Sequence, residues 1–187
     1  MSTPLRIVAL AGSLRRASLN RGVARAAVEL APPGTVVEAA YIDDIPLYNG
    51  DLDGATQPPG VAALKAKLAA ADAVLIVTPE YNYSVPGVLK NTLDWLSRGT
   101  QKPLKGKPVA IVGASPGYFG TVRSQTHLRW VLDVLQARNM PQPEMIVPLA
   151  DKKADADGNL TDEETRNKLR GLLERLVEWA ARFPKED

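Results

Sequence analysis

Three short apolar runs constrain this chain more than any other feature of its sequence. Residues 5–11, 73–77 and 108–114 are almost entirely apolar, and each run leads into a loop and then a helical pattern. Runs of this length without polar alternation are typical of strands buried on both faces of a parallel sheet. We therefore expect an open parallel sheet covered by helices on both sides.

Weaker strand and helix patterns alternate with these runs. Strands are also expected at residues 36–41 and 145–147. Helices are expected after Asn20, at about residues 61–71, 86–97 and 121–138, and from near Asp162. Thr161 and Glu164 are expected to form a capping box at the start of the last helix. Five strands that alternate with five helices predict a flavodoxin-like, doubly wound α/β fold with strand order 2-1-3-4-5. Residues 42–60, rich in Asp, Gly and Pro, are interpreted as a surface excursion, so residues 1–187 are expected to form a single domain.

The turn after the first run has the composition of a phosphate site. Its polar side chains are Ser13, Arg15, Arg16, Ser18 and Asn20. The turn ends where a helix begins, and free N–H groups at a helix N-terminus favour an anion. The turn lacks both a P-loop lysine and a G-x-G-x-x-G pattern. In the alternative interpretation Asn20 is only an N-cap and the arginines are solvated.

The loop after residues 73–77 crowds Tyr81, Asn82 and Tyr83 at the carboxyl end of a buried strand, which is where open α/β sheets bind ligands. Pro79 stiffens the entry to this loop, and Pro86 marks the start of the next helix. Such a loop can present backbone N–H groups to a flat heteroaromatic ring. The alternative is an ordinary strand–loop–helix junction with aromatic packing.

The third loop, residues 115–120, offers the Ser115 hydroxyl and glycines that allow close backbone approach. Residues 113–117 also match the G-x-S-x-G pattern of a hydrolase nucleophile elbow. A hydrolase of that kind needs a carboxylate between Ser115 and a later histidine. His127 is the only histidine, and residues 116–126 contain no Asp or Glu, so the hydrolase interpretation is rejected.

Two of these motifs carry a family resemblance. The residues Gly12-Ser13-Leu14-Arg15 with Ser18 and Asn20, followed by Pro79-Glu80-Tyr81-Asn82-Tyr83-Ser84-Val85-Pro86-Gly87, resemble the NADPH-dependent FMN reductase family, and within it the soluble bacterial quinone/chromate reductases. Both motifs occur in the expected order, and the similarity extends over nearly the whole chain. The resemblance implies tightly bound FMN and a transient hydride donor, NADPH or NADH.

The resemblance also implies roles for particular residues. The expected cofactor-binding residues are Ser13, Arg15, Ser18, Leu19 and Asn20 in the first turn, Pro79, Glu80, Tyr81 and Asn82 in the second loop, and Ser115 and Gly117 in the third. Within this set, Arg15 is the strongest candidate for a phosphate contact. Tyr83 is expected at the substrate rim. No catalytic side chain is expected, because the flavin itself carries the chemistry. No metal ligand is expected, because the chain has one histidine and no cysteine.

The implied function is an NAD(P)H-dependent FMN/quinone reductase. Electrons would pass from a nicotinamide to quinones and similar small acceptors, such as chromate, azo or nitro compounds and free flavin, by a ping-pong reaction at one flavin face. The alternative is a flavodoxin-type electron carrier, or a flavin-binding regulator, without NAD(P)H turnover. Carriers commonly dock through a strongly acidic face, whereas this chain has a formal net charge of +2.

Composition excludes several other function classes. The 23 basic and 21 acidic residues are too closely balanced to indicate nucleic-acid binding. The chain has no cysteine, which excludes disulfides and thiol chemistry and fits a cytoplasmic location. No apolar run approaches a membrane span, and residues 1–4 lead directly into a strand, so neither a membrane anchor nor a signal peptide is expected.

Three further features have structural interpretations. The lone His127 is expected to be structural rather than a metal ligand. Residues 155–159 resemble part of an EF-hand loop, but Lys153 would occupy the first ligand position, so a polar turn is expected instead. The helix at residues 86–97 has a broad apolar surface that includes Trp95. This surface indicates a subunit contact in a homodimer or homotetramer, or else a wider intramolecular core.

Overall fold

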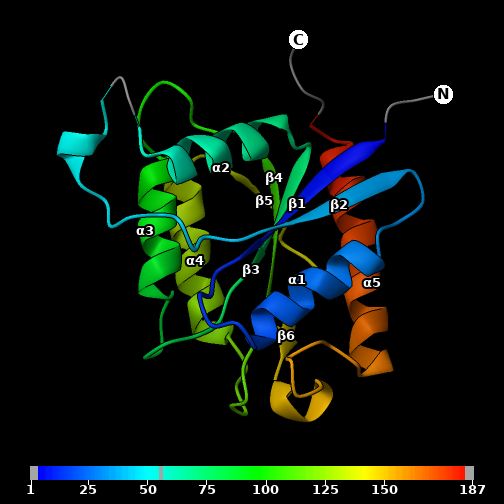
Figure 1. Cartoon of the computed structure of the whole chain (residues 1–187). Helices are drawn as coiled ribbons and strands as arrows, with labels where there is room; N and C mark the ends of the chain where they lie inside the picture. Colours follow the sequence, from blue (N-terminus) through cyan, green and yellow to red (C-terminus); the bar gives the residue numbers. More distant parts are fainter. Residues whose placement is uncertain (1–3, 55–56, 184–187) are drawn as a thin grey trace.

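The computed structural model of the chain describes residues 4–54 and 57–183. Residues 1–3 and residues 55–56 of the predicted surface excursion lie outside the described residues. The strands form a parallel sheet with the path β2-β1-β3-β4-β5, and β6 also pairs with β4 (Figure 1). Their bounds are β1 (Leu5–Ala11), β2 (Thr35–Ala40), β3 (Ala73–Val77), β4 (Pro108–Ala114), β5 (Arg138–Asn139) and β6 (Met145–Val147). The predicted flavodoxin-like order is thereby confirmed.

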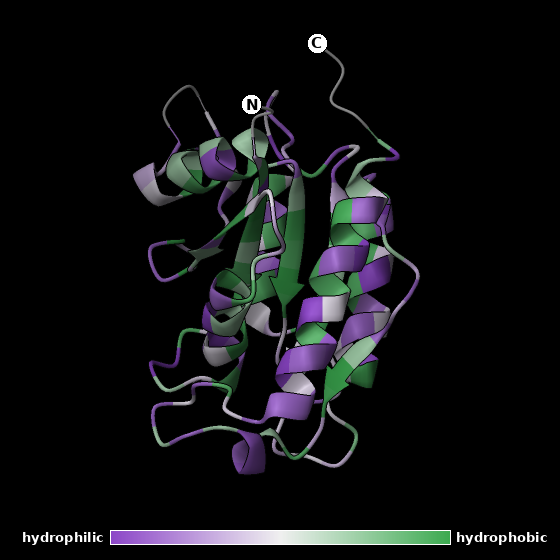
Figure 2. Cartoon of the chain, turned by 90° about the vertical axis from the view of Figure 1, so that its right-hand side faces the viewer, coloured by the Kyte–Doolittle hydropathy of each residue, from purple (hydrophilic) through white to green (hydrophobic). Residues whose placement is uncertain are grey.

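Helices cover both faces of this sheet. Their bounds are α1 (Leu19–Glu29), α2 (Pro59–Ala70), α3 (Gly87–Leu96), α4 (Val122–Val134) and α5 (Glu163–Ala180), with short 3-10 helices at Gly50–Leu52 and Ala150–Lys153. Successive residues of a strand face opposite sides of a sheet. Ile7 and Ala9 of β1 accordingly pack with α1 and α5, whereas Val8 and Leu10 pack with α2, α3 and α4. Figure 2 shows hydrophobic strands between helices whose outer faces are largely hydrophilic.

The strand order places a switch point between β1 and β3. The strand β1 pairs with β2 on one side and with β3 on the other, so the chain moves away from β1 in opposite directions. Ligands of open α/β sheets bind at the carboxyl edge near such a point. Ala11 lies opposite Val77, and Val77 lies opposite Val112, so the loops after β1, β3 and β4 begin side by side.

The edge of the sheet differs from the prediction. The single strand expected at residues 145–147 is the second of two short pieces that pair with different parts of β4. Pro141 and Pro143 lie between the pieces and have no N–H group to donate, which interrupts the edge.

Two other elements also differ from their predicted bounds. The helix expected over 121–138 ends at Val134, because Gln136 turns the chain with a φ of 59°. The strand expected at 36–41 begins one residue earlier, at Thr35.

The predicted capping box of the last helix was wrong. Asp162 is the N-cap of α5, and its carboxylate accepts a hydrogen bond from the Thr165 amide at 2.9 Å. Thr161 instead donates to the Lys153 carbonyl at 3.4 Å, and Glu164 pairs with Lys168 at 2.6 Å. A charged acceptor is favoured over a hydroxyl at the positive end of a helix. The Thr165 contacts in turn hold the pKa of Asp162 below its usual value.

Trp95 belongs to an intramolecular core. Its side chain is fully buried, and its indole N–H donates to the Pro46 carbonyl at 2.8 Å. The Tyr48 ring packs edge-on against the indole with a centroid distance of 4.9 Å. The broad apolar surface of α3 therefore anchors the segment after β2, and Trp95 is not available for a subunit contact.

A polar loop between β6 and α5 rests against α1. The Arg25 side chain donates to Asn159 Oδ1 at 2.7 Å, and a Cβ on Gly22 would lie only 1.7 Å from the Gly158 carbonyl oxygen. Asp155 accepts hydrogen bonds from within the loop, and those of Asn159 lower the pKa of its carboxyl group. This loop supports the N-terminal half of α1 and, through it, the turn after β1.

Two helix glycines should respond in opposite directions to the same substitution. Gly22→Ala should destabilise the protein by about 1–3 kcal/mol, because the added methyl group overlaps Gly158. Gly171→Ala in α5 should stabilise it by about 0.5–1 kcal/mol, because nothing lies within 4 Å of the added methyl group. Urea denaturation of both variants measures the difference. Equal stabilities would contradict the packing of this loop on α1.

Candidate functional site

The turn after β1 is held tightly against its neighbours. The Gly12 amide donates to the Val77 carbonyl at 2.8 Å. Ser13 and Ser18 are only 1% and 3% exposed, whereas Arg15 and Arg16 are exposed. Ser18 is the N-cap of α1, so the helix begins at the carboxyl edge of the sheet with its first-turn amides directed there. The guanidinium group of Arg15 curls back to donate to the Ala17 carbonyl at 3.2 Å.

Asn20 joins this turn to β4. Its side-chain amide donates to the Ala114 carbonyl at 2.8 Å, and its side-chain oxygen accepts from the Ala114 amide at 2.9 Å. Both polar atoms of the side chain are therefore engaged with the last residue of β4. This pairing places the phosphate-like turn beside the loop that follows β4, and Asn20 is not the N-cap of the alternative interpretation.

The loop after β3 contains a tight two-residue turn. Tyr81 and Ser84 exchange backbone hydrogen bonds of 3.1 and 3.0 Å, and between them Asn82 and Tyr83 adopt φ values of 49° and 64°. Left-handed backbone is tolerated by asparagine but is uncommon for a bulky residue, and such strain concentrates at functional sites. Tyr81 and Tyr83 are 51% and 65% exposed, whereas Pro79 is buried. The turn therefore holds two exposed rings and its own backbone at the edge of the sheet.

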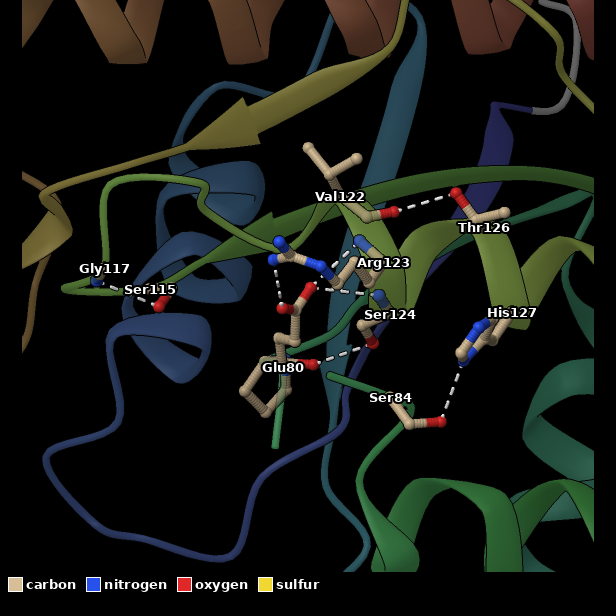
Figure 3. A network of polar contacts seen from close by, with 10 residues as sticks. Glu80, Ser84, Ser115, Gly117, Val122, Arg123, Ser124, Thr126 and His127 are labelled. Atoms are coloured by element: carbon tan, nitrogen blue, oxygen red, sulfur yellow. Dashed lines mark hydrogen bonds and ion pairs between the residues drawn. The ribbon is translucent and has the colours of Figure 1, made fainter. Parts of the chain in front are cut away.

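The Glu80 side chain points toward α4 rather than toward the open edge (Figure 3). Its Oε2 atom accepts from the backbone amides of Arg123 and Ser124, each at 3.0 Å. Its Oε1 atom lies 3.5 Å from the Arg123 guanidinium group. Sequence reasoning did not single out Arg123 or Ser124, because contacts over 43 and 44 positions leave no local pattern. The only signal was their position at a helix start after a ligand loop.

The loop after β4 is close to both other loops. The Ser115 hydroxyl oxygen accepts from the Gly117 amide at 3.1 Å, which shapes the loop internally (Figure 3). A Cβ on Gly113 would lie 2.2 Å from both the Thr78 carbonyl oxygen and the Thr121 hydroxyl oxygen, so only glycine fits where the end of β4 meets these two loops. Tyr118 and Phe119 are 79% and 64% exposed beyond this point.

His127 contacts the loop after β3 and is directed away from Ser115. Its Nδ1 atom lies 3.0 Å from the Ser84 hydroxyl oxygen, and its ring stacks on Trp130 with a centroid distance of 5.3 Å. This contact agrees with the structural interpretation of His127 and gives Ser115 no histidine base. Among the described residues there is no group of three or more His, Asp or Glu side chains that could hold a metal ion.

The candidate site lies along the carboxyl edge of the sheet, where the loops after β1, β3 and β4 begin. A groove of about 1390 Å³ lies elsewhere, lined by residues that include Lys102, Lys105 and Arg138 at the amino end of β4 and β5. None of the three ligand loops lines this groove. We place the site at the switch point because the loop geometry and the donor groups lie there. Each helix within residues 4–54 and 57–183 is too short or too polar to span a bilayer.

Comparison with known proteins identifies the family. The model of the NADPH-dependent FMN reductase family matches residues 5–152. The chain belongs to this family. An NAD(P)H-dependent FMN reductase of Pseudomonas aeruginosa is 43% identical over 98% of this chain and 99% of its own length. A quinone reductase of Escherichia coli strain K12 is 45% identical over 97% of this chain and 98% of its own length.

A solved structure agrees with both. The flavoenzyme FerB of Paracoccus denitrificans, an NAD(P)H:(acceptor) oxidoreductase, superposes with a TM-score of 0.84 at 36% identity, covering 96% of this chain and 98% of FerB. These matches confirm the predicted family, the oxidoreductase class, and the use of FMN and NAD(P)H by this FMN reductase.

The residues present fit FMN chemically. The turn after β1 combines hydroxyl groups, a guanidinium group and a helix N-terminus, which are phosphate ligands. The strained turn after β3 exposes backbone that can bond the edge of a flat ring, and the loop after β4 adds a hydroxyl group and glycines. The three loops therefore provide donors for a phosphate, a ring and the polar chain between them.

Proposed function

We propose that this chain is an FMN-dependent NAD(P)H:quinone oxidoreductase. The observation that carries the proposal is the meeting of three loops at the switch point of the sheet, in a chain of the FMN reductase family. The Escherichia coli relative, which is named a quinone reductase, supports quinones as acceptors. Chromate, azo and nitro compounds and free flavin are further acceptors within this proposal.

Each loop has a separate role in binding FMN. The proposed contacts are Ser13, Arg15, Ser18, Leu19 and Asn20 for the phosphate, Pro79, Glu80, Tyr81 and Asn82 for the ring, and Ser115 and Gly117 for the ribityl chain or the ring. Arg15 is the strongest phosphate contact, because a guanidinium group forms charge-assisted and bidentate hydrogen bonds. Asn20 acts through its backbone or by holding the turn in place, since Ala114 occupies its side chain.

FMN, when bound, supplies the redox chemistry by accepting a hydride and passing electrons on. The residues of the chain bind and orient it, and no side chain is required as an acid or base. Tyr83 stands at the substrate rim, where its exposed ring borders the open edge. Because the β3 and β4 loops flank one open face, the nicotinamide and the acceptor occupy that face in turn. We therefore propose ping-pong kinetics.

We also propose that residues 1–187 act as a single FMN-binding domain that assembles into a homodimer or homotetramer in the cytoplasm. The outer face of α4 supports assembly, because Val122, Trp130 and Val134 are 46%, 63% and 83% exposed along one stripe of the helix. The lack of cysteine fits a reducing compartment.

NADPH or NADH alone should bleach the visible flavin absorbance of the FMN-loaded protein, and a quinone should restore it. Stopped-flow spectroscopy follows both halves of the reaction, and steady-state double-reciprocal plots should give parallel lines. An FMN-loaded protein that neither nicotinamide reduces would support the electron carrier instead. Intersecting lines would still support an enzyme, but they would exclude binding of the nicotinamide and the acceptor in turn at one shared flavin face.

Arg15→Ala should weaken FMN binding by roughly 10- to 150-fold, the equivalent of a lost charge-assisted hydrogen bond of about 1.5–3 kcal/mol. Arg16→Ala is the matched control, since it removes the same charge from the neighbouring position. Fluorescence titration of the apo-proteins with FMN compares the two. Equal losses, or no loss for Arg15→Ala, would remove Arg15 from the phosphate site.

A further inference from the structure

We propose that Glu80 is a positioning residue whose side chain, directed to the start of α4, sets the spacing of the β3 and β4 loops through Arg123. This role of the side chain is separate from the ring contact proposed for Glu80, which its backbone can make. The inference rests on the proposed function, because it concerns how firmly FMN is held between these loops. Three sets of contacts lead to it.

The first is the cap of α4. This helix begins at Val122, and Thr121 before it makes no side-chain capping bond. Amides in the first turn of a helix have no partner within the helix. Glu80 supplies the missing partner from another segment of the chain. A single oxygen of its carboxylate accepts hydrogen bonds from the Arg123 and Ser124 amides, at 3.0 Å each. The Glu80 side chain is only 11% exposed, and a carboxylate is favoured at the positive end of a helix.

The second is the arrangement around Arg123. Its guanidinium group lies 3.5 Å from the other Glu80 oxygen, 4.1 Å from the centre of the Tyr83 ring and 5.0 Å from the centre of the Phe119 ring. Tyr83 belongs to the strained turn after β3, and Phe119 belongs to the loop after β4. One cation, held by Glu80, therefore joins the exposed ends of both loops.

The third is a backbone anchor close to Glu80. The Ser124 hydroxyl donates to the Pro79 carbonyl next to Glu80 at 2.9 Å (Figure 3). It also lies 3.1 Å from the Thr78 hydroxyl. The start of α4 is therefore joined to three consecutive residues of the chain, Thr78, Pro79 and Glu80. A change in the Glu80 carboxylate is transmitted to this loop and to Arg123 together.

A plain helix cap and a positioning role predict different results for Glu80→Gln. Glutamine keeps an oxygen that can accept from the two amides, but it has no charge for Arg123. If Glu80 only caps α4, this variant should bind FMN like the wild type. If Glu80 acts through Arg123, Glu80→Gln should weaken FMN binding by about tenfold, and Glu80→Ala should weaken it further.

The experiment is a double-mutant cycle in apo-protein titrated with FMN, using Glu80→Gln, Arg123→Gln and the pair. The inference predicts that Glu80→Gln has no further effect once Arg123 is replaced. Glu38→Gln is the matched control. This substitution removes the carboxylate of Glu38 on β2, which is paired with Arg6 at 3.1 Å and with Lys67 at 3.4 Å. Because Glu38 lies outside the three ligand loops, the variant should bind FMN with unchanged affinity.

The outcomes separate this inference from the proposed function. Additive losses from Glu80→Gln and Arg123→Gln, or wild-type affinity in Glu80→Gln, would overturn the positioning role while FMN binding itself stands. Wild-type protein that takes up no FMN would overturn the proposed function. If Glu80→Ala does not fold, the isosteric Glu80→Gln cycle still decides the question.

Discussion

Burial of β1, β3 and β4 on both faces is the constraint on which the rest of this structure depends. Their side chains are apolar wherever they meet the two helix layers, so the sheet itself offers almost no polar chemistry. Polar groups that act on a ligand must then come from the loops. Parallel pairing brings the loops after these three strands to the same edge. The location of the site is thus a consequence of how the core is packed.

The same constraint explains which elements could be predicted from the sequence. The runs that became β1, β3 and β4 have the predicted bounds, because a strand buried on both faces is apolar along its whole length. Elements at the edge of the sheet carry weaker patterns. The piece at Arg138–Asn139 is two residues long and polar, and it forms through pairing with β4. No local periodicity marks such a strand.

The loops of the site were predictable, but the directions of their side chains were not. Strand–loop–helix order and turn composition identify where a phosphate and a ring are expected. The amide of Asn20 and the carboxylate of Glu80 both resemble ligand groups in the sequence, yet each bonds another part of the chain. These partners are 94 and 43 positions away, so only the packed structure reveals them. The N-cap of α5 was missed for a local reason. Asp162 follows Thr161 directly, and both residue types are common N-caps, so the sequence does not distinguish them.

The left-handed turn at Asn82 and Tyr83 affects how much conformational entropy the β3 loop loses when a ligand binds. Asn82 tolerates this conformation, but in Tyr83 it costs free energy of order 1–3 kcal/mol, and the surrounding contacts offset that cost during folding. The loop is consequently ordered before any ligand arrives. A ligand that binds there loses little affinity to the conformational entropy of the loop, since that entropy has already been removed. Association should therefore resemble the docking of two rigid surfaces, with a heat-capacity change that follows the apolar area buried at the contact.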